Sequence, residues 1–189
     1  PRLIEVPAEL DTYGECVQAV TLAMVAALYP KLLMIEPKSD QMRTLTNNQP
    51  AAIHPSSVNF RTYPSSFRSH FVLYHTIMMS KRLYAWDTAY VSDVNVLLAG
   101  GDAEFKHASR SLFLDHNRVR MATFDAKSLL ALRVLRTELA RNLQASYNHP
   151  GLGWSDDEQA VFALTLEVLG ASHRMATTGK PEEGKGNMW

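Results

Sequence analysis

The first clear element of the chain is an apolar segment that runs from Cys16 to Tyr29. Hydrophobic residues occupy most sides of its helical projection, which predicts a helix that is buried on several faces. The preceding stretch 12–15 (Thr-Tyr-Gly-Glu) has the spacing of a capping box, and Pro30 cannot continue a helix. We therefore expect one N-terminal helix that ends before Pro30, with Cys16 as a small packing residue inside it.

From residue 32 to residue 124 the pattern changes to short apolar segments separated by turn residues. Two segments flank the stretch 47–50 (Asn-Asn-Gln-Pro), which predicts a hairpin or a bulged strand, and two more flank the polar stretch 80–82. Short strands with irregular connections favour a small closed barrel over a sandwich. The predicted strands are Leu32–Ile35, Met42–Thr46, Ala51–His54, Phe71–Met79, Leu83–Thr88, Val94–Ala99, Leu112–Leu114 and Val119–Phe124.

Helical patterning returns after Asp125, which is a favourable N-cap residue. A second capping box at 155–158 (Ser-Asp-Asp-Glu) opens a last helix, which we expect to end at Gly170. Residues 176–189 are rich in Gly, Lys and Glu and are expected to form a flexible tail. The first of the two helices is predicted to pack through a stripe of leucines, namely Leu132, Leu135, Leu139 and Leu143.

Together these elements predict a mainly β fold with flanking α-helices: a five-stranded barrel, one N-terminal helix and two C-terminal helices. The predicted organisation is an N-terminal helix in residues 1–30, the barrel in 31–124, two helices packed on the barrel in 125–175, and the tail in 176–189. A chain of 189 residues suits one domain with an appended helical element. Because the chain begins at Pro1 without a methionine, we expect it to be a fragment of a longer protein.

The charge of the chain is balanced overall but uneven along its length. Nineteen Lys and Arg match nineteen Asp and Glu, so the composition gives no general field that would attract nucleic acid. Residues 38–82, however, carry six cations against Asp40 alone, and residues 115–141 carry six cations against three acids. Such clustering predicts either a face that meets a polyanion or an ordinary solvated surface, and charge alone favours the latter.

Composition excludes several classes of protein. The single cysteine allows neither an internal disulfide nor a Cys-based zinc site, and it favours a reducing, intracellular compartment without fixing which one. Apolar runs fall short of the roughly 18 residues that a membrane span requires, so no membrane contact is expected. The phosphate-binding loop of nucleotide enzymes and the motifs GxGxxG, HExxH and GxSxG are missing from the sequence. His70 and His75, five apart on one predicted strand, are poorly placed to share a metal. We therefore predict no catalytic residue, metal or cofactor in this chain.

The most distinctive stretch is 51–60, where a predicted strand enters a polar loop. The loop offers an imidazole, two hydroxyls and an amide from His54, Ser56, Ser57 and Asn59. These groups suit the sugar hydroxyls, phosphate oxygens and base edges of single-stranded RNA. Ser and Asn in a loop also commonly cap turns, and the residues by themselves slightly favour that structural role.

Several further landmarks occur in a fixed order along the chain. A Leu-Tyr-Pro step at 28–30 precedes the stretch 53–58 (Ile-His-Pro-Ser-Ser-Val), and 71–76 (Phe-Val-Leu-Tyr-His-Thr) follows. Next come 83–88 (Leu-Tyr-Ala-Trp-Asp-Thr) and 96–101 (Val-Leu-Leu-Ala-Gly-Gly). From about Cys16 to Leu169, this succession resembles the C-terminal region of DEAH/RNA-helicase-A-type ATP-dependent RNA helicases.

The resemblance implies an oligonucleotide-binding barrel, or OB-fold, at the C-terminal end of a helicase, with residues 1–30 as the end of the helical ratchet region. In that family the module covers an RNA channel formed with two RecA-like motor domains, which bind ATP and Mg. Single-stranded RNA and the RecA-like and ratchet domains are thus the implied partners. The implied RNA contacts are His54, Ser56, Ser57 and Asn59 in the loop, and Ser80, Lys81 and Arg82 in the hairpin.

Two departures from the family pattern stand out. The family often has Arg-Thr where this chain has Met79-Ser80, and Lys81 and Arg82 are candidates to replace the lost cation. The family's Asp-x-Trp-Ile-x-Phe is replaced at 115–120 by a sequence that adds Arg118 and Arg120, two apart and hence on one face of a strand.

The function predicted from the sequence is an accessory domain that helps to bind single-stranded RNA in the helicase channel without catalysing a reaction itself. An alternative is a docking module that recruits cofactor proteins to the helicase. A third, weaker interpretation is a free-standing OB protein unrelated to helicases.

Overall fold

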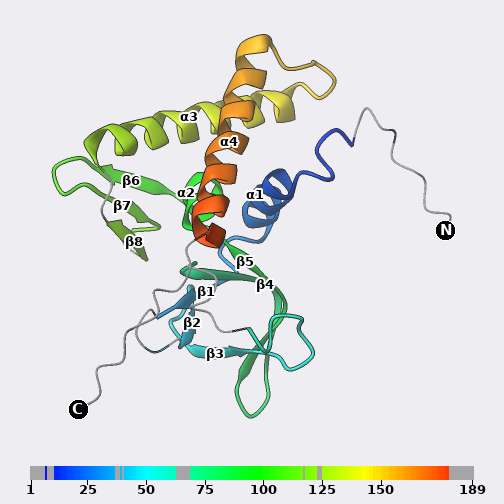
Figure 1. The fold of residues 1–189 in the computed structure, drawn as a ribbon, viewed down its shortest axis with the longest axis vertical. Coiled ribbons are helices and arrows are strands. Elements are labelled where there is room, and N and C mark those ends of the chain that lie inside the picture. The colour runs from blue at the N-terminus through cyan, green and yellow to red at the C-terminus, as the bar shows by residue number, and fades with distance from the viewer. Residues whose placement is uncertain are drawn as a thin grey trace.

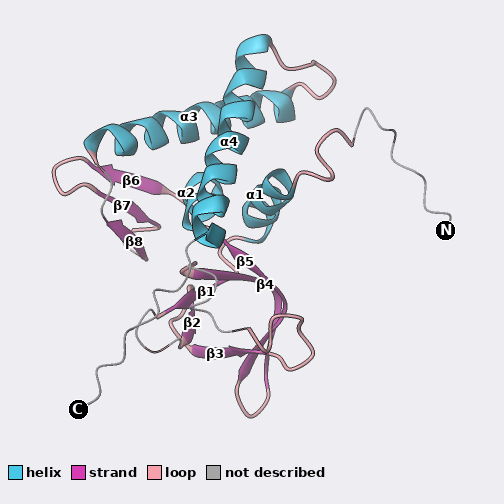
Figure 2. Ribbon diagram, viewed as in Figure 1, coloured by secondary structure: helices cyan, strands magenta, loops and turns pink. Residues whose placement is uncertain are grey.

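In the computed structural model, the described residues are 7, 11–36, 39, 41–62, 69–116, 118–122 and 125–178. A barrel forms one end of the molecule, helices lie across its middle, and a small sheet lies under a long helix at the side (Figures 1 and 2). The elements in chain order are α1 (Val17–Leu28), β1 (Leu32–Ile35), β2 (Met42–Thr44), β3 (Pro50–Ile53), β4 (Phe71–Met79), β5 (Leu83–Val91), α2 (Asp93–Ala99), β6 (Ala103–Lys106), β7 (Ser111–Leu114), β8 (Val119–Ala122), α3 (Ala126–Asn148) and α4 (Asp156–Thr178).

Five strands close the barrel in the order β1-β2-β3-β5-β4. Neighbouring strands of the barrel are antiparallel, except that β3 and β5 run parallel, with Ile53 opposite Ala85. Because successive side chains of a strand point to opposite faces, β1 sends Leu33 into the barrel interior and Leu32 outward. The predicted five-stranded barrel with flanking helices is confirmed.

A second, larger core lies outside the barrel, between the helices and the small sheet. Leucines and valines from every part of the chain meet there, so burial of apolar area ties the barrel to the rest of the molecule. The side chains that are fully removed from water in this core include Val25 of α1, Leu32 of β1, Leu73 of β4, Val96 and Leu97 of α2, Leu112 and Leu114 of β7, and Leu129 of α3.

Residues 93–122 differ from the predicted barrel strands. Val94–Ala99, predicted as a strand, lies in α2, because the Ser92 side chain accepts a hydrogen bond from the Asn95 amide and so caps a helix. A short apolar run cannot by itself distinguish a strand from a buried helix. The strands predicted near 112–114 and 119–124 are present as β7 and β8, but they form a separate three-stranded sheet with β6. The sequence analysis missed β6, although residues 103–106 alternate apolar and charged side chains as a half-buried strand does.

The helix boundaries test the capping predictions. The box predicted at 12–15 is wrong, since α1 has Cys16 at its N-cap position and no side-chain cap bond. Asp125 does cap α3, and Ser155 and Glu158 satisfy each other's amides before α4, as predicted. Gly170 does not end α4, which continues to Thr178; glycine inside a helix costs only about 1 kcal/mol. Residues 176–178 of the predicted tail therefore lie in α4, and 179–189 lie outside the described residues.

The leucine stripe predicted for α3 is partly correct. Leu135 and Leu139 are buried, whereas Leu143 is 47% exposed and Asn142 is buried beside it. The side-chain amide nitrogen of Asn142 lies 3.5 Å from the Glu158 carbonyl oxygen, so residue 142 faces α4 rather than solvent.

A polar contact at the centre of the molecule joins α3 to the turn after α2. The Arg136 guanidinium donates hydrogen bonds to the carbonyl oxygens of Leu97, Gly100 and Gly101. Burial lowers the pKa of Arg136, an effect that the nearby acid Asp102 opposes. Three carbonyl groups that no helix or sheet satisfies are thereby paired.

The end of α1 reaches the same turn. The Tyr29 hydroxyl donates to Asp115 Oδ2 at 2.5 Å, and the Asp102 amide donates to Asp115 Oδ1 at 2.9 Å. Burial and the bond to this carboxylate raise the pKa of Tyr29 well above its ordinary value, so the hydroxyl stays a donor. We call this set of contacts the junction; its members are Tyr29, Leu97, Gly100, Gly101, Asp102, Asp115 and Arg136.

Among the described residues, no helix is both long and apolar enough to cross a lipid bilayer.

Candidate nucleic-acid interface

Three aromatic rings lie together on the outside of the barrel, and we call them the aromatic cluster. The His54 ring lies against the Trp86 ring, with 4.1 Å between centroids and 35° between planes. Tyr84 meets His54 edge-on at 5.6 Å. Ala85 points into the barrel interior, so its neighbours Tyr84 and Trp86 on β5 point outward. All three rings are half-buried, which leaves part of each accessible.

The position of His54 follows from strand pairing. Ile53 lies opposite Ala85 in the parallel β3–β5 pair, and the His54 amide donates to the Ala85 carbonyl oxygen at 2.9 Å. The Ser56 amide donates to His54 Nδ1 at 3.2 Å, and the Ser56 hydroxyl lies 2.7 Å from the same nitrogen. Since Nδ1 accepts these contacts, the neutral ring carries its proton on Nε2.

Ser57 and Asn59, two further residues predicted to contact RNA, point toward β5. Ser57 Oγ lies 2.9 Å from Thr88 Oγ1, while Asn59 Nδ2 donates to the Thr88 carbonyl oxygen at 2.7 Å and to Oγ1 at 3.1 Å. Thr88 is 8% exposed, so these contacts pin the loop against the barrel. The structural role that the sequence also allowed is therefore present, and RNA contact by Ser57 and Asn59 stays a prediction.

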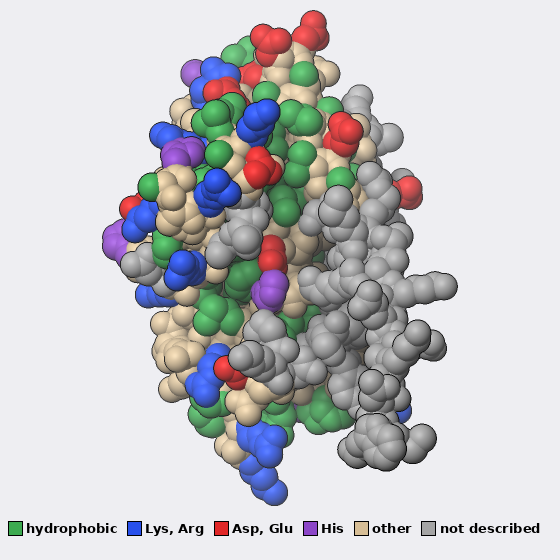
Figure 3. All heavy atoms as spheres, turned by 60° about the vertical axis from the view of Figure 1, so that its left-hand side comes forward, with side chains coloured by type: hydrophobic (Ala, Val, Ile, Leu, Met, Phe, Trp, Pro, Cys, Tyr) green, Lys and Arg blue, Asp and Glu red, His purple; other side chains and the backbone are tan. Residues whose placement is uncertain are grey.

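The β4–β5 hairpin carries the other predicted residues. Ser80, Lys81 and Arg82 are exposed at its tip, where the Ser80 amide donates to the Arg82 carbonyl oxygen at 2.8 Å. Figure 3 shows Lys and Arg side chains at the lower tip of the molecule, where Figure 1 places this hairpin. Arg82 directly precedes β5, two residues before Tyr84. The hairpin cations therefore lie at the end of the strand that carries Tyr84 and Trp86.

The sequence-based prediction missed Tyr84 and Trp86 as site residues. A signal was present, because two aromatic residues alternate on the strand that follows the basic hairpin. What the sequence could not supply was the parallel β3–β5 pairing, which brings His54 onto Trp86 from a segment about thirty residues away. The Trp86 indole nitrogen is covered and has no hydrogen-bond partner among the described residues.

The chemistry of this surface is that of binding. It combines aromatic faces, hydroxyl groups and two cations, which can stack on bases and contact a phosphate backbone. Within the described part of the chain, no three His, Cys, Asp or Glu side chains gather as metal ligands would.

Comparisons with known proteins bear on the barrel directly. Residues 20–103, which include the barrel and α2, match the family model described as oligonucleotide/oligosaccharide-binding (OB)-fold. The ATP-dependent DNA/RNA helicase DHX36 of Bos taurus is 23% identical over 171 residues, covering 86% of this chain and 17% of the relative. DHX36 of Homo sapiens is 24% identical over 156 residues, covering 79% of this chain and 15% of the relative.

The chain thus spans about a sixth of the length of these two helicases. The similarity to these helicases extends over most of this chain, and the segment matched by the family model contains the closed barrel, most of α1 and all of α2. The resemblance predicted from the sequence is confirmed as a similarity: residues 20–103 match the OB-fold family model, and most of the chain is similar to two ATP-dependent helicases.

Proposed function

We propose that this chain is an accessory domain of an ATP-dependent RNA helicase and that the outside of its barrel holds single-stranded RNA. The observation that carries the proposal is the aromatic cluster of His54, Tyr84 and Trp86 beside the exposed cations of the β4–β5 hairpin. Stacking on aromatic rings tolerates every base, and cations alongside follow the backbone.

In this proposal some residues contact RNA and others hold the loop in position. Trp86 and His54 offer stacking surfaces, while Lys81 and Arg82 contact phosphates and Ser56 and Ser80 offer hydroxyls to the ribose. Ser57 and Asn59 act through Thr88, which holds the loop in place. Few cations take part, so binding is weak in isolation, sensitive to salt and nearly independent of base sequence.

The rest of the activity belongs to other parts of the parent protein. In this proposal the parent hydrolyses ATP with Mg on RecA-like domains, and this chain catalyses no reaction itself. The names of the two relatives support the ATP-dependent helicase activity of the parent. A ratchet domain packs against α1, whose exposed apolar residues Val17, Val20 and Met24 are ready to be covered.

The test is the affinity of the 189-residue chain for a fluorescein-labelled oligouridine of about twelve nucleotides, measured by fluorescence anisotropy. We expect Trp86→Ala to weaken binding about tenfold, because each stacked base contributes 1–3 kcal/mol. The double variant Lys81→Ala/Arg82→Ala should lower the slope of log affinity against log salt by about 1 to 2, because up to two phosphate contacts are lost.

Two matched variants serve as controls. Tyr147 is an aromatic residue 84% exposed on α3, and Lys127 is an exposed cation at the start of the same helix. Tyr147→Ala and Lys127→Ala should leave affinity and salt slope unchanged. Equal loss in the cluster variants and the controls, or no loss in either, would refute the proposal.

A further inference from the structure

A cavity of about 390 Å³ lies where the barrel meets the small sheet. One wall comes from the barrel through Met34, Ile35 and Phe71, and the opposite wall is the stretch 118–121, which is Arg118 and the first three residues of β8. Its size falls within the range of ordinary ligand sites, and it does not include any residue of the aromatic cluster. It is therefore a separate feature from the proposed RNA surface.

The β8 wall is the edge of a sheet. Four consecutive residues, 118–121, border the cavity, and because neighbouring strand residues point to opposite faces, the cavity follows the strand's edge rather than one face. β8 is last in the order β6-β7-β8, so among the described residues its outer edge has no strand partner. Figure 1 places β8 on the barrel side of its sheet. Unpaired amide and carbonyl groups along such an edge can pair with an added strand.

The solvent face of this sheet is positively charged beside the edge. Arg118 and Arg120 are both exposed and two residues apart, and no ion pair to either is found in the described part of the chain. The Arg120 guanidinium lies 5.8 Å from the Phe113 ring centroid, which holds it over the sheet. Figure 3 shows Lys and Arg side chains gathered on the face formed by α3 and the small sheet.

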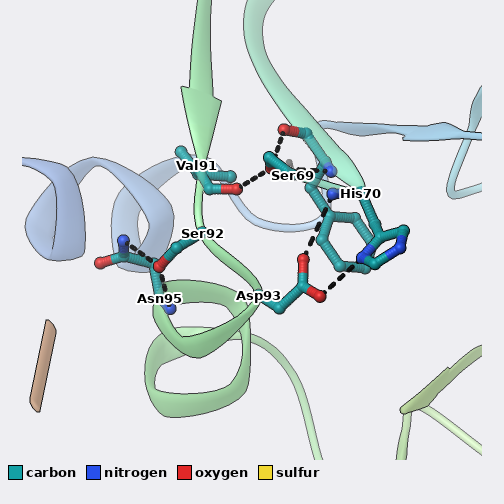
Figure 4. A network of polar contacts seen from close by, with 7 residues as sticks. Ser69, His70, Val91, Ser92, Asp93 and Asn95 are labelled. Carbon is teal, nitrogen blue, oxygen red and sulfur yellow. Dashed lines mark hydrogen bonds and ion pairs between the residues drawn. The ribbon is translucent and has the colours of Figure 1, made fainter. Parts of the chain in front are cut away.

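At the rim of the cavity, His70 and Asp93 already satisfy each other. Asp93 Oδ2 lies 2.6 Å from His70 Nδ1, and Asp93 Oδ1 accepts the His70 amide at 3.3 Å (Figure 4). Because His70 occupies this carboxylate, it does not neutralise the arginines across the cavity. The two arginines therefore remain the groups at this cavity that need an anionic partner, and a carboxylate side chain suits them.

We propose that β8 accepts an extended segment of a partner protein as a fourth strand of the small sheet, and that this segment alternates acidic and apolar residues. Its backbone pairs with the free edge, its acidic side chains meet Arg118 and Arg120 on the solvent face, and its apolar side chains enter the cavity beside Met34. Strand addition supplies affinity through main-chain hydrogen bonds and specificity through alternate side chains. The proposal does not depend on RNA binding by the aromatic cluster.

The test uses the whole chain and a fluorescein-labelled peptide of alternating Glu and Val, about eight residues long and blocked at both ends. We expect the Glu-Val peptide to bind and a Lys-Val peptide of the same pattern not to bind. The double variant Arg118→Glu/Arg120→Glu should lower the affinity for the Glu-Val peptide at least about tenfold. Lys127→Glu, an exposed change of the same sign on α3, is the matched control and should leave binding unchanged.

A second measurement separates strand pairing from simple charge attraction and needs no protein variant. N-methylation of alternate peptide amides removes the donors that would face β8, whereas methylation of the intervening amides leaves those donors in place. We expect one methylated series to lose binding and the other to keep it. Equal loss of binding in the two methylated series would overturn the proposal. It would also be overturned if oligouridine displaced the Glu-Val peptide and Arg118→Glu/Arg120→Glu weakened the binding of RNA instead of the binding of the peptide.

Discussion

The junction and the loop after β3 are both networks of short polar contacts, yet they differ in what surrounds them. In the junction, Arg136 and Tyr29 are directed at the backbone and at Asp115, where α1, α2, α3 and the small sheet converge. In the loop, Ser57 and Asn59 fix the backbone through Thr88, but His54 and Ser56 remain at the surface. The comparison indicates that the junction stabilises the fold, whereas the loop holds the surface for which we propose RNA binding in position.

The largest effect is expected at Gly100 in the junction. A Cβ atom there would lie 2.5 Å from the Val96 carbonyl oxygen and 2.9 Å from the Tyr29 ring, and neither the α2 backbone nor the bonded ring can move away. We expect Gly100→Ala to reduce the free energy of unfolding by about 2–3 kcal/mol, as overpacking of a tight site does. Urea unfolding followed by circular dichroism measures this change.

Gly153, in the connection between α3 and α4, is the matched control. No atom lies within 4 Å of the position its Cβ would take, so Gly153→Ala should change stability by less than about 0.5 kcal/mol. If both variants lost the same stability, the close approach at the junction would not be what makes Gly100 necessary.

A smaller effect is expected when the loop is released from the barrel. Asn59→Ala removes the bonds to the Thr88 carbonyl and hydroxyl, which should lower the free energy of unfolding by about 1 kcal/mol. Because Thr88→Val removes part of the same contact, the double variant should lose less than the sum of the two single losses.

The same pair of variants sharpens the division of roles within the loop. Asn59→Ala should weaken RNA binding less than Trp86→Ala does, because in our proposal the amide acts only through the position of the loop. Additive stability losses in the double variant, together with an RNA effect as large as that of Trp86→Ala, would show that Asn59 contacts RNA itself.

Much of the fold was predictable from the sequence because its signals are local. The bounds of β1 and β4, the start of β5 and the caps at Asp125 and Ser155 follow from alternation, turn residues and side-chain spacing. The predictions that failed needed more than alternation of apolar residues. The Ser92 cap starts α2, which also packs on both α1 and α3, and Gly170 stays helical next to Leu169, which is buried in the core outside the barrel.

The candidate site shows the same division. His54 and the hairpin cations were predictable from residue type and from the resemblance, while Trp86 required knowledge of which strands pair in parallel. The role of Gly100-Gly101 was visible only as a break in the pattern. Gly100 approaches Tyr29 from about seventy residues away, and Tyr29 bonds to Asp115 across 86 residues, so no local signal encodes these contacts.

The smallest expected effect is a change of stability with pH that arises at the start of α3, the helix that carries Arg136 of the junction. α3 carries the junction's Arg136 and begins at Asp125, whose carboxylate accepts the amides of Lys127 and Ser128 at 2.9 Å. Hydrogen bonds from Ser128 hold the pKa of Asp125 below its ordinary value near 3.8. A lowered pKa in the folded state means that this stabilisation is complete above the unfolded value and fades as the pH falls through the folded one.

We therefore compare wild type with Asp125→Asn, which still caps the helix but does not titrate. At pH 7 the wild type should have the higher melting temperature, because a charged cap also interacts favourably with the helix dipole, and this advantage should shrink below about pH 4. Ser128→Ala removes the first cause of the lowered pKa, so it should shift that loss toward higher pH. Thermal unfolding at constant ionic strength and several pH values measures both. If the difference in melting temperature between wild type and Asp125→Asn stayed constant down to about pH 2, the charge of the Asp125 carboxylate would not be what stabilises α3 and, with it, the junction.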